Sequence, residues 1–302
     1  MPSPPAHLKL LREAGRIAGA ARDLGARLIR PGVRVREVCA AVEDEILRRG
    51  AGLAFPTQSS RNAIAAHYCP GRDDPTVYEA GDVAKLDVGA HLDGWVVDTA
   101  VTVNVGDVPA HRALVEAPAA ALEAAIAAAR PGVPVIHLSA VIEATILARR
   151  QRPVANLCGH GVGRWMVHCA PPVPNVPEGT FGAVLEPGMA VAIEPFATTG
   201  AGRMVERGAA QVFRFLDRPA VPAPDEAAPA VLDALRALRG LPFARHQLAA
   251  LPADEVERTL AALVKQRRVQ AYPPLVEPTG ALVAQAEHTL WIGESEVEVL
   301  TR

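Results

Sequence analysis

Two different spacings of apolar side chains along this chain predict a mixture of helices and strands. Residues 35–49 and 135–149 are amphipathic, with the three-to-four-residue interval of a helix. Residues 83–91 and 95–103 are instead rich in valine and other strand formers, and the Asp-Gly pair at 93–94 is typical of a two-residue hairpin turn. We therefore expect an α+β protein that contains at least one antiparallel hairpin.

The helical pattern belongs to an internal repeat with an offset of 100 residues. Residues 30–49 (RPGVRVREVCAAVEDEILRR) and 130–149 (RPGVPVIHLSAVIEATILAR) are identical at ten of twenty positions. Each unit is interpreted as a helix that ends at Pro-Gly, followed by a second, amphipathic helix. We interpret the repeat as a duplicated α+β half. The alternative is chance similarity between two helix–turn–helix connections in an alanine-rich chain.

A segment of different composition interrupts the second half. Short strand candidates lie near 189–197 and 281–292, and residues 205–275 lie between them. This segment contains an Ala/Pro-rich link from Pro219 to Pro229, helix candidates around 228–239 and 253–267, and a strand candidate at 268–272. Helices followed by a short hairpin are typical of a winged-helix-like unit. We predict one domain, 1–302, with residues 205–275 as an inserted helical, winged-helix-like subdomain that packs beside a groove.

Composition narrows the classes of partner and compartment. The formal net charge is -2, and the segment 205–275 has no strong basic bias, so neither nucleic acid nor an anionic membrane is an expected partner. The four cysteines lack CxxC spacing and are interpreted as free thiols in a reducing compartment. The first residues lack a signal-peptide core, and no apolar run reaches membrane-spanning length. These features predict a cytoplasmic protein.

The predicted hairpin brings two aspartates together. With a two-residue turn, Asp98 lies opposite Gly89, two residues from Asp87 on the same strand. Their backbones are then diagonal neighbours, about 7–8 Å apart on one face of the sheet. Two carboxylates among buried-strand residues repel each other unless a cation lies between them. The pair therefore favours a metal site over the alternative of two solvent-facing polar residues.

Three more residues extend this set. His160 lies between two glycines, and Glu194 and Glu287 are each embedded in apolar, strand-like sequence. A buried glutamate is costly without a proton, a cation or several hydrogen-bond donors. A lone histidine in such a position is more often structural, but in this company it is a candidate ligand. Four carboxylates and one histidine form a hard, oxygen-rich set that suits a pair of Mn, Fe, Co or Zn ions.

Several stretches together resemble a known family, the type II methionine aminopeptidases in their short, archaeal-like form. The resemblance spans essentially the whole chain and is carried by residues 55–68, 85–100, 159–168, 193–198 and 285–289. It implies the pita-bread fold, in which two pseudo-symmetric α+β halves surround a central antiparallel sheet. The internal repeat agrees with that expectation.

The resemblance also implies residue roles and two divalent metal ions per chain. Asp87 resembles a ligand of one metal, Asp98 and Glu287 resemble bridging carboxylates, and His160 and Glu194 resemble ligands of the second metal. His67 and His168 resemble histidines that contact the substrate and the tetrahedral intermediate, Glu194 resembles a general base, and Phe55 is expected to line the methionine pocket. Without the resemblance, His67 and His168 would be interpreted as structural histidines. His91 and His288 lie beside ligands and are left outside the site.

The implied activity is removal of the N-terminal, initiator methionine from nascent proteins whose second residue is small. The implied protein is a monomer. One alternative is a proline-specific peptidase of the same fold, although such relatives typically carry a long N-terminal domain. Another is a catalytically inactive binding protein on this fold, although such relatives lose metal ligands.

Overall fold

The computed structural model describes residues 5–179, 182–218 and 222–302. The start of the predicted Ala/Pro-rich link, 219–221, therefore lies outside the described residues. The helices are α1 (Ala6–Leu28), α2 (Val35–Arg48), α3 (Arg112–Ala128), α4 (Val135–Ala148), α5 (Pro229–Ala237) and α6 (Ala253–Lys265), with 3-10 helices η1 (Pro109–His111) and η2 (Arg245–Leu248).

The strands of the first half and of the repeat region are β1 (Gly52–Leu53), β2 (Gln58–Arg61), β3 (Ile64–Ala66), β4 (Val83–Leu92), β5 (Trp95–Asn104), β6 (Arg152–Pro153), β7 (Cys158–Gly163), β8 (Met166–Pro174), β9 (Ala190–Ile193) and β10 (Phe196–Thr198). The remaining strands are β11 (Val205–Glu206), β12 (Val212–Phe215), β13 (Pro242–Ala244), β14 (Val269–Tyr272), β15 (Leu275–Val276), β16 (Val283–Gln285), β17 (Glu287–Ile292) and β18 (Val297–Val299).

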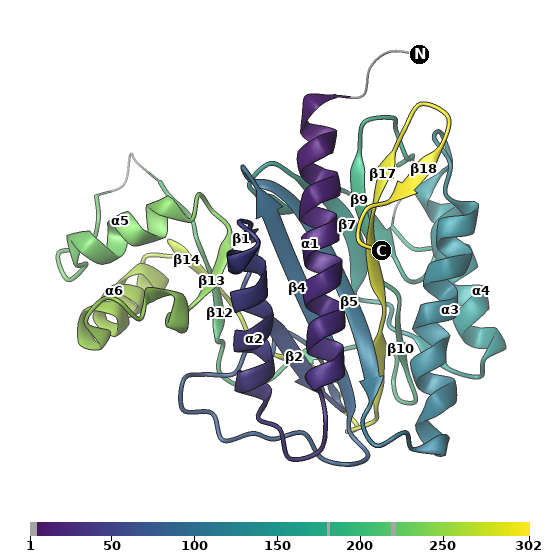
Figure 1. Ribbon diagram of the computed structural model, residues 1–302, viewed down its shortest axis with the longest axis horizontal. Helices are drawn as coiled ribbons and strands as arrows, with labels where there is room; N and C mark the ends of the chain where they lie inside the picture. Colours follow the sequence, from purple (N-terminus) through teal and green to yellow (C-terminus); the bar gives the residue numbers. More distant parts are fainter. Residues whose placement is uncertain (1–4, 180–181, 219–221) are drawn as a thin grey trace.

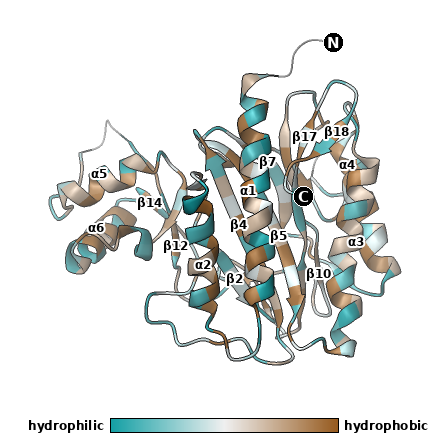
Figure 2. Cartoon of the chain, in the orientation of Figure 1, coloured by the Kyte–Doolittle hydropathy of each residue, from teal (hydrophilic) through white to brown (hydrophobic). Residues whose placement is uncertain are grey.

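A curled antiparallel sheet forms the centre of the molecule. Its strands follow the order β1-β4-β5-β17-β9-β7-β8, with β2 added beside β4 and β18 beside β17. Helices α1 and α2 cover the first half of one face, and α3 and α4 cover the second half (Figure 1). Apolar and polar positions alternate along α1 and α2, so each helix has an apolar side to bury against the sheet (Figure 2).

The repeat corresponds to two similar structural units, as predicted. Helices α2 and α4 begin at residues 35 and 135 and end at residues 48 and 148, which preserves the offset of 100. In both units the Pro-Gly turn is fixed by the same bond: Gly32 N–H donates to Tyr78 C=O, and Gly132 N–H donates to Leu185 C=O. Each unit has its own hydrophobic cluster under its helix pair. The α+β fold of two related halves is therefore confirmed.

The predicted hairpin forms in the predicted register. Leu92 pairs with Trp95, and Gly89 pairs with Asp98. Both turn residues, Asp93 and Gly94, have positive φ, as a tight turn of the I′ kind requires. Strands β4 and β5 thus enter the central sheet with the two aspartates already placed.

Two other predicted strands are interrupted at matching points. The candidate near 189–197 is divided into β9 and β10 at Glu194-Pro195, and the candidate near 281–292 is divided into β16 and β17 at Ala286. Ala286 N–H donates to Pro195 C=O, so the two breaks face each other. Proline has no N–H to give to a ladder, which is the physical reason that the pairing changes here.

The segment 205–275 contains more sheet than the sequence pattern indicated. The predicted helices are found as α5 and α6, and the strand candidate at 268–272 as β14. However, β14 does not form a hairpin with the strand that follows it. It pairs with β12, which precedes both helices, and β13 joins the other edge of β12. A separate hydrophobic cluster, which includes Phe213, Leu235 and Leu263, holds α5 and α6 on these strands.

No helix within the described residues is both long and apolar enough to cross a membrane.

Candidate metal centre and substrate cavity

The two hairpin aspartates lie on the face of the sheet opposite the helices. Leu86 and Val88 belong to the core cluster under α1 and α2, so the alternating residues Asp87 and Gly89 face the other way. Asp98 shares this face through its pairing with Gly89. Its side chain is 4% exposed, and Asp87 is half-buried. The predicted juxtaposition of these carboxylates is therefore found in the structure.

His160, Glu194 and Glu287 approach from the second half. His160 Nε2 lies 3.8 Å from Asp98 Oδ2 and 3.6 Å from Glu194 Oε1. Glu287 begins β17, beside β5, and is 1% exposed. Among the described residues, ligand atoms of Asp98, His160 and Glu287 lie within 4.8 Å of one another and form a possible metal site. The other two predicted ligands, Asp87 and Glu194, do not belong to this trio.

Several carboxylate oxygens at this point lack a hydrogen-bond partner, as expected of oxygens that bind a cation. Asp87 Oδ1, Asp98 Oδ1 and Glu287 Oε1 are buried without a hydrogen-bond partner among the described residues. Buried polar atoms are nearly always satisfied in native proteins, so a cluster of three indicates a missing positive partner. Carboxylate oxygens with one imidazole suit Mn, Fe, Co or Zn and exclude a thiolate-bound structural zinc site.

The pKa shifts of these carboxyl groups also indicate that a positive partner is missing. Burial raises the pKa of Asp98, Glu194 and Glu287 well above the ordinary carboxyl values, and the neighbouring carboxylates raise each of them further. Burial likewise raises the pKa of Asp87. Burial lowers the pKa of His160 to about 3, with help from His168, so this imidazole is neutral and its ring can ligate.

A cavity of about 60 Å³ opens beside these residues. Its walls include Asp87, Asp98 and His160 together with the predicted substrate residues Phe55, His67 and His168. Phe55 is buried against β4, where a Cβ atom on Gly89 would lie 2.2 Å from the Phe55 ring. The absence of a side chain at Gly89 therefore leaves room for the Phe55 ring, which forms one wall of the cavity.

His67 is fixed in an unusual backbone conformation. It has a φ of +66°, its N–H donates to Gln58 Oε1 at 2.8 Å, and its Nδ1 lies 3.2 Å from Pro273 C=O. Positive φ is uncommon for a residue with a side chain and is often found at functional sites. Burial lowers the pKa of His67 below its ordinary value, although Pro273 opposes this shift.

His168 lies edge-on against His160, with ring centroids 4.3 Å apart. Its side chain is exposed at the mouth of the cavity. Surrounding protein atoms nevertheless lower its pKa to about 4, and repulsion from His67 and Arg214 adds to the effect. The ring is thus a neutral hydrogen-bonding group beside the candidate ligands.

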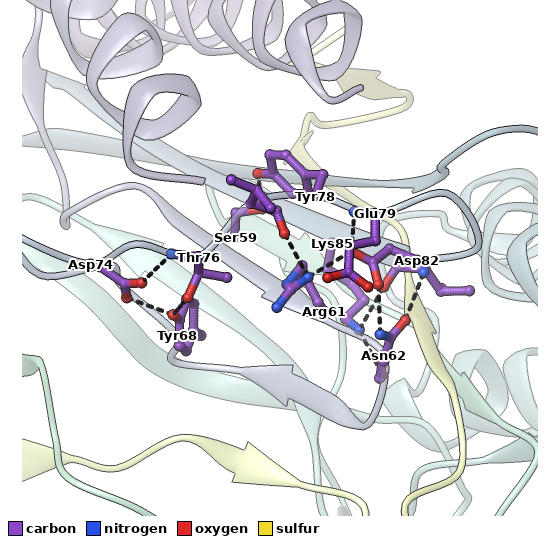
Figure 3. A network of polar contacts seen from close by, with 12 residues as sticks. Ser59, Arg61, Asn62, Tyr68, Asp74, Thr76, Tyr78, Glu79, Asp82 and Lys85 are labelled. Atoms are coloured by element: carbon purple, nitrogen blue, oxygen red, sulfur yellow. Dashed lines mark hydrogen bonds and ion pairs between the residues drawn. The ribbon is translucent and has the colours of Figure 1, made fainter. Parts of the chain in front are cut away.

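Figure 3 shows a polar network on the first half that holds strand β4, which carries Asp87, and the segment just after β3, where His67 lies. Asp82 accepts hydrogen bonds from Arg61 and Asn62, each at 2.8 Å. The buried Lys85, two residues before Asp87, donates to Asn62 C=O at 2.9 Å. Tyr68, which follows His67, donates to Asp74 at 2.6 Å. These bonds rigidify the wall of the cavity on the β2–β4 side.

The chain can now be placed among known proteins. Residues 9–214 match the sequence pattern of metallopeptidase family M24. This chain belongs to metallopeptidase family M24. Methionine aminopeptidase from Archaeoglobus fulgidus is 39% identical over 292 residues, and the match covers 97% of each chain. Methionine aminopeptidase from Thermococcus kodakarensis is 40% identical over 300 residues, and the match covers 96% of this chain and 98% of that one.

Solved structures share the M24 fold. Methionine aminopeptidase from Thermotoga maritima has a TM-score of 0.74 at 24% identity, covering 99% of this chain and 98% of that one. A thermophilic Arx1 has a TM-score of 0.87 at 15% identity, covering 99% and 91%. Prolidase from Pyrococcus furiosus has a TM-score of 0.61 at 20% identity, covering 99% of this chain and 65% of that one. These likenesses confirm the pita-bread fold, and membership of a metallopeptidase family implies the use of divalent metal.

Several residues of this M24 site were not identified from the sequence. Gln285 Nε2 donates to Glu194 Oε2 at 3.3 Å and to Glu287 Oε2 at 3.5 Å. Because Gln285 and Glu287 are two residues apart in strand-like sequence, their shared face was a usable signal. Tyr272, on β14, lines the cavity and contacts the His67 ring edge-on at 5.6 Å. No local pattern marks it, since it reaches the site through the fold of the 205–275 segment.

The two histidines left outside the site do not line the cavity. His91 Nδ1 accepts a hydrogen bond from Gly94 N–H at 3.2 Å, at the far end of the hairpin. His288 is buried on the helix-covered face beside Thr99. The glycine before His160 is required by the packing of the sheet. A Cβ on Gly159 would lie 2.3 Å from Ala192 C=O, so it is the neighbouring strand that requires glycine.

Proposed function

We propose that this chain is a methionyl aminopeptidase that hydrolyses the N-terminal, initiator methionine from proteins and peptides whose second residue is small. The strongest support is the 39% identity to an archaeal methionine aminopeptidase over 97% of both chains. The arrangement of Asp98, His160 and Glu287 beside a cavity walled by Phe55 supports it from the side of chemistry.

We propose that two divalent ions are held per chain, by Asp87, Asp98, His160, Glu194 and Glu287. Four ionised carboxylates carry four negative charges, and two divalent cations balance them. Within the described residues, no lysine or arginine forms an ion pair with any of the four carboxylates, so the protein itself offers no such balance. Asp87 would help to hold one ion, His160 and Glu194 would help to hold the other, and Asp98 and Glu287 would contribute to both.

The residues around the ions have distinct tasks in this proposal. When bound, the ions supply Lewis acidity, which lowers the pKa of a water molecule and polarises a carbonyl. Glu194 accepts the proton of the attacking water and passes it toward the leaving amine. His168 donates a hydrogen bond to the oxygen that gains negative charge, and His67 orients the amide of the scissile bond.

Two cavities share His67 as a lining residue, and each would receive a different part of the peptide. The cavity of about 60 Å³ lies on the metal side and receives the methionine side chain against Phe55. A second cavity of about 410 Å³ also touches His67 and is lined by Arg207, Gln211 and Pro274. This second cavity would accommodate the residues of the peptide that follow the methionine. His67, which lines both cavities, would lie beside the second residue of the peptide.

Release of methionine from Met-Ala-Ser and Met-Pro peptides tests the proposal directly. Metal-stripped protein is assayed with and without added Mn²⁺ or Co²⁺, with Ala-Pro peptides as the control for proline specificity. We expect metal-dependent cleavage of the methionyl peptides and its loss in Asp98→Asn. Cleavage confined to Xaa-Pro bonds would move the chain to the proline-specific branch. Absence of cleavage with every metal would favour an inactive binding protein.

We propose further that the protein works as a cytoplasmic monomer that binds no nucleic acid, and that 205–275 is an inserted subdomain of the single domain 1–302. All four cysteines are free, as is usual in a reducing compartment. Val212, Pro242 and Tyr272 from this segment line the cavity, which supports a role in closing the substrate groove. Gel filtration coupled to light scattering tests the monomer, and a dimer mass would contradict it.

A further inference from the structure

The reverse side of the metal centre contains an arrangement of hydroxyl groups that the mechanism above does not use. Asp98 and Glu287 lie on neighbouring strands, β5 and β17, which pair directly at two positions, Glu287 with Ala100 and His288 with Thr99. Beyond these positions the backbones do not pair directly. Another connection must therefore set the distance between the strands at Asp98.

Threonine hydroxyls provide that connection. The Thr289 hydroxyl accepts from Asp98 N–H at 2.8 Å and donates to Asp98 C=O at 2.7 Å. The Thr99 hydroxyl donates to Glu287 C=O at 2.9 Å. The Thr289 hydroxyl takes the place of a backbone partner for Asp98, and the Thr99 hydroxyl adds a bond to the backbone of Glu287. Thr99 and Thr289 are fully buried, so water cannot compete for these bonds.

A second layer of residues holds these two threonines, one through its hydroxyl and the other through its backbone. Arg22, on α1, donates from Nη1 to the Thr99 hydroxyl at 2.7 Å and to Thr301 C=O at 3.1 Å. The Thr301 hydroxyl accepts from Thr289 N–H at 3.1 Å and lies 2.8 Å from His288 Nδ1. Because Arg22 Nη1 also points at this nitrogen from 3.4 Å, His288 Nδ1 is the acceptor and the Thr301 hydroxyl is the donor.

The packing of α1 keeps this layer in place. A Cβ on Gly15 would lie 2.1 Å from Leu300 C=O, and one on Gly19 would lie 2.8 Å from Thr301 C=O. These two glycines let residues 300–301 lie directly on the helix, and the last residues of the chain lie beside β17 (Figure 1). The Arg22 side chain is 11% exposed, and its other nitrogens are engaged by Asp23. Arg22 and Thr301 therefore have little freedom to move.

We propose that Arg22 and Thr301 are positioning residues for the metal centre: Arg22 holds the Thr99 hydroxyl, Thr301 holds the backbone of Thr289, and these two threonines set the spacing of Asp98 and Glu287. This inference rests on the proposed function of those two carboxylates as metal ligands. Outer groups that hold ligands in place typically change metal affinity 10–100-fold when they are removed. A purely structural role would instead lower thermal stability and leave the metal centre of the folded protein unchanged.

Titration of the full-length, metal-stripped protein with Co²⁺ distinguishes the two roles. The affinity is measured by calorimetry, and the ligand geometry by the visible absorption of the bound Co²⁺. We expect Thr301→Val and Arg22→Met to weaken Co²⁺ binding about 10–100-fold and to alter the spectrum. Thr301→Ser keeps the hydroxyl and should restore the wild-type affinity and spectrum. Arg302→Gln, next to Thr301 but paired with Glu123 at the surface, is the matched control and should bind normally.

Wild-type affinity and spectrum in folded Thr301→Val and Arg22→Met would overturn the inference, whatever their melting temperatures. Equal weakening in Thr301→Ser and Thr301→Val would overturn it as well, because the hydroxyl would not then be the cause. If one of the two main variants does not fold, the other decides, since each removes a different bond of the same layer. Metal affinity is measured without peptide, so a wild-type protein that binds Co²⁺ but releases no methionine contradicts the proposed function alone.

Discussion

At the scale of single residues, the lack of a side chain at Gly89 shapes the substrate cavity. Gly89 lies opposite Asp98 on the hairpin, and the Phe55 ring fills the space that a Cβ would occupy. Phe55 is buried, so its ring cannot move aside without disturbing the packing around it. Gly89 thus lies between the candidate metal ligand Asp98 and the Phe55 wall of the cavity.

Gly89→Ala is expected to displace Phe55 and to lower kcat/KM for methionyl peptides at least about tenfold, in line with the cost of a small misplacement of binding groups. Metal affinity should change little, because Asp87 and Asp98 keep their register. Steady-state kinetics and Co²⁺ titration measure the two effects. The matched control is Gly71→Ala, where a Cβ meets nothing within 4 Å. Unchanged kinetics in Gly89→Ala would contradict this view of the pocket.

Glu277 provides a pH-dependent contribution to stability away from the metal centre. Desolvation raises its pKa, but hydrogen bonds from Thr279, Ala201 and Ala281 outweigh it and lower the pKa to about 2. The contribution is therefore complete above the ordinary pKa of 4.5 and disappears as the pH falls toward 2. Glu277→Gln should cost about 2 kcal/mol at pH 7, the usual value for bonds to a charged acceptor. Urea unfolding should give a smaller difference at pH 3.5, and an equal difference at both pH values would contradict the assignment.

At this scale, the residues with a local signature were predictable and the others were not. The register of Asp87 and Asp98 follows from a two-residue turn and the alternation of side chains, and it was found as predicted. His67 and His168 have no such signature, and their assignment depended on the resemblance to a family. Tyr272 reaches the cavity from a distant strand, and nothing in its neighbourhood in the sequence indicates that.

At the scale of elements, the repeated helices α2 and α4 have diverged at a shared residue. Glu43 and Glu143 occupy equivalent positions. Glu43 is 7% exposed, accepts from Thr57 N–H at 2.9 Å and lies 2.9 Å from His246 Nε2. It therefore ties α2 both to the loop after Phe55 and to the 205–275 segment. Glu143 is half-buried and has no comparable partner within the described residues.

This pair gives a prediction with its own control. Glu43→Ala should destabilise the protein by about 2–3 kcal/mol, because it leaves the buried Thr57 N–H without an acceptor. Glu143→Ala should stay within about 0.5 kcal/mol of the wild type, as surface changes usually do. Urea denaturation of both variants measures the difference. Equal losses would mean that the two positions are still equivalent in energy.

The positions of the helices and strands were predicted better than the pairing between the strands. The boundaries of α2, α4 and the hairpin follow from periodicity and turn residues, which are local properties. The pairing of β14 with β12 joins segments more than fifty residues apart, and it depends on which edges α5 and α6 leave open. Strand pairing of this kind is decided by tertiary packing and does not appear in the local pattern.

At the scale of the whole molecule, the metal centre is a link between folding and binding. Four carboxylates with raised pKa values gather in the interior, where their mutual repulsion opposes the folded state. Divalent cations bound as proposed would relieve that repulsion in the folded chain, and the unfolded chain would offer them no equivalent site. Stability should therefore depend on metal concentration.

Adding Mn²⁺ or Co²⁺ at about one hundred times Kd should stabilise the protein by about 2.7 kcal/mol for the first ion that binds. For a domain of this size the melting temperature should then rise by about 5 °C. Differential scanning calorimetry before and after chelation measures the shift, and Mg²⁺ at the same ionic strength is the control. The rise should be absent in Asp98→Asn. A rise of equal size in that variant would show that the ions act elsewhere on the surface.

The duplication has a consequence for how the metal centre is assembled. Asp87 and Asp98 come from the first α+β half, while His160, Glu194 and Glu287 come from the second. Neither half contains the whole set, so each half taken alone would lack a complete candidate metal centre. The arrangement of the two halves against each other, and not the fold of either one, therefore decides whether the five side chains meet.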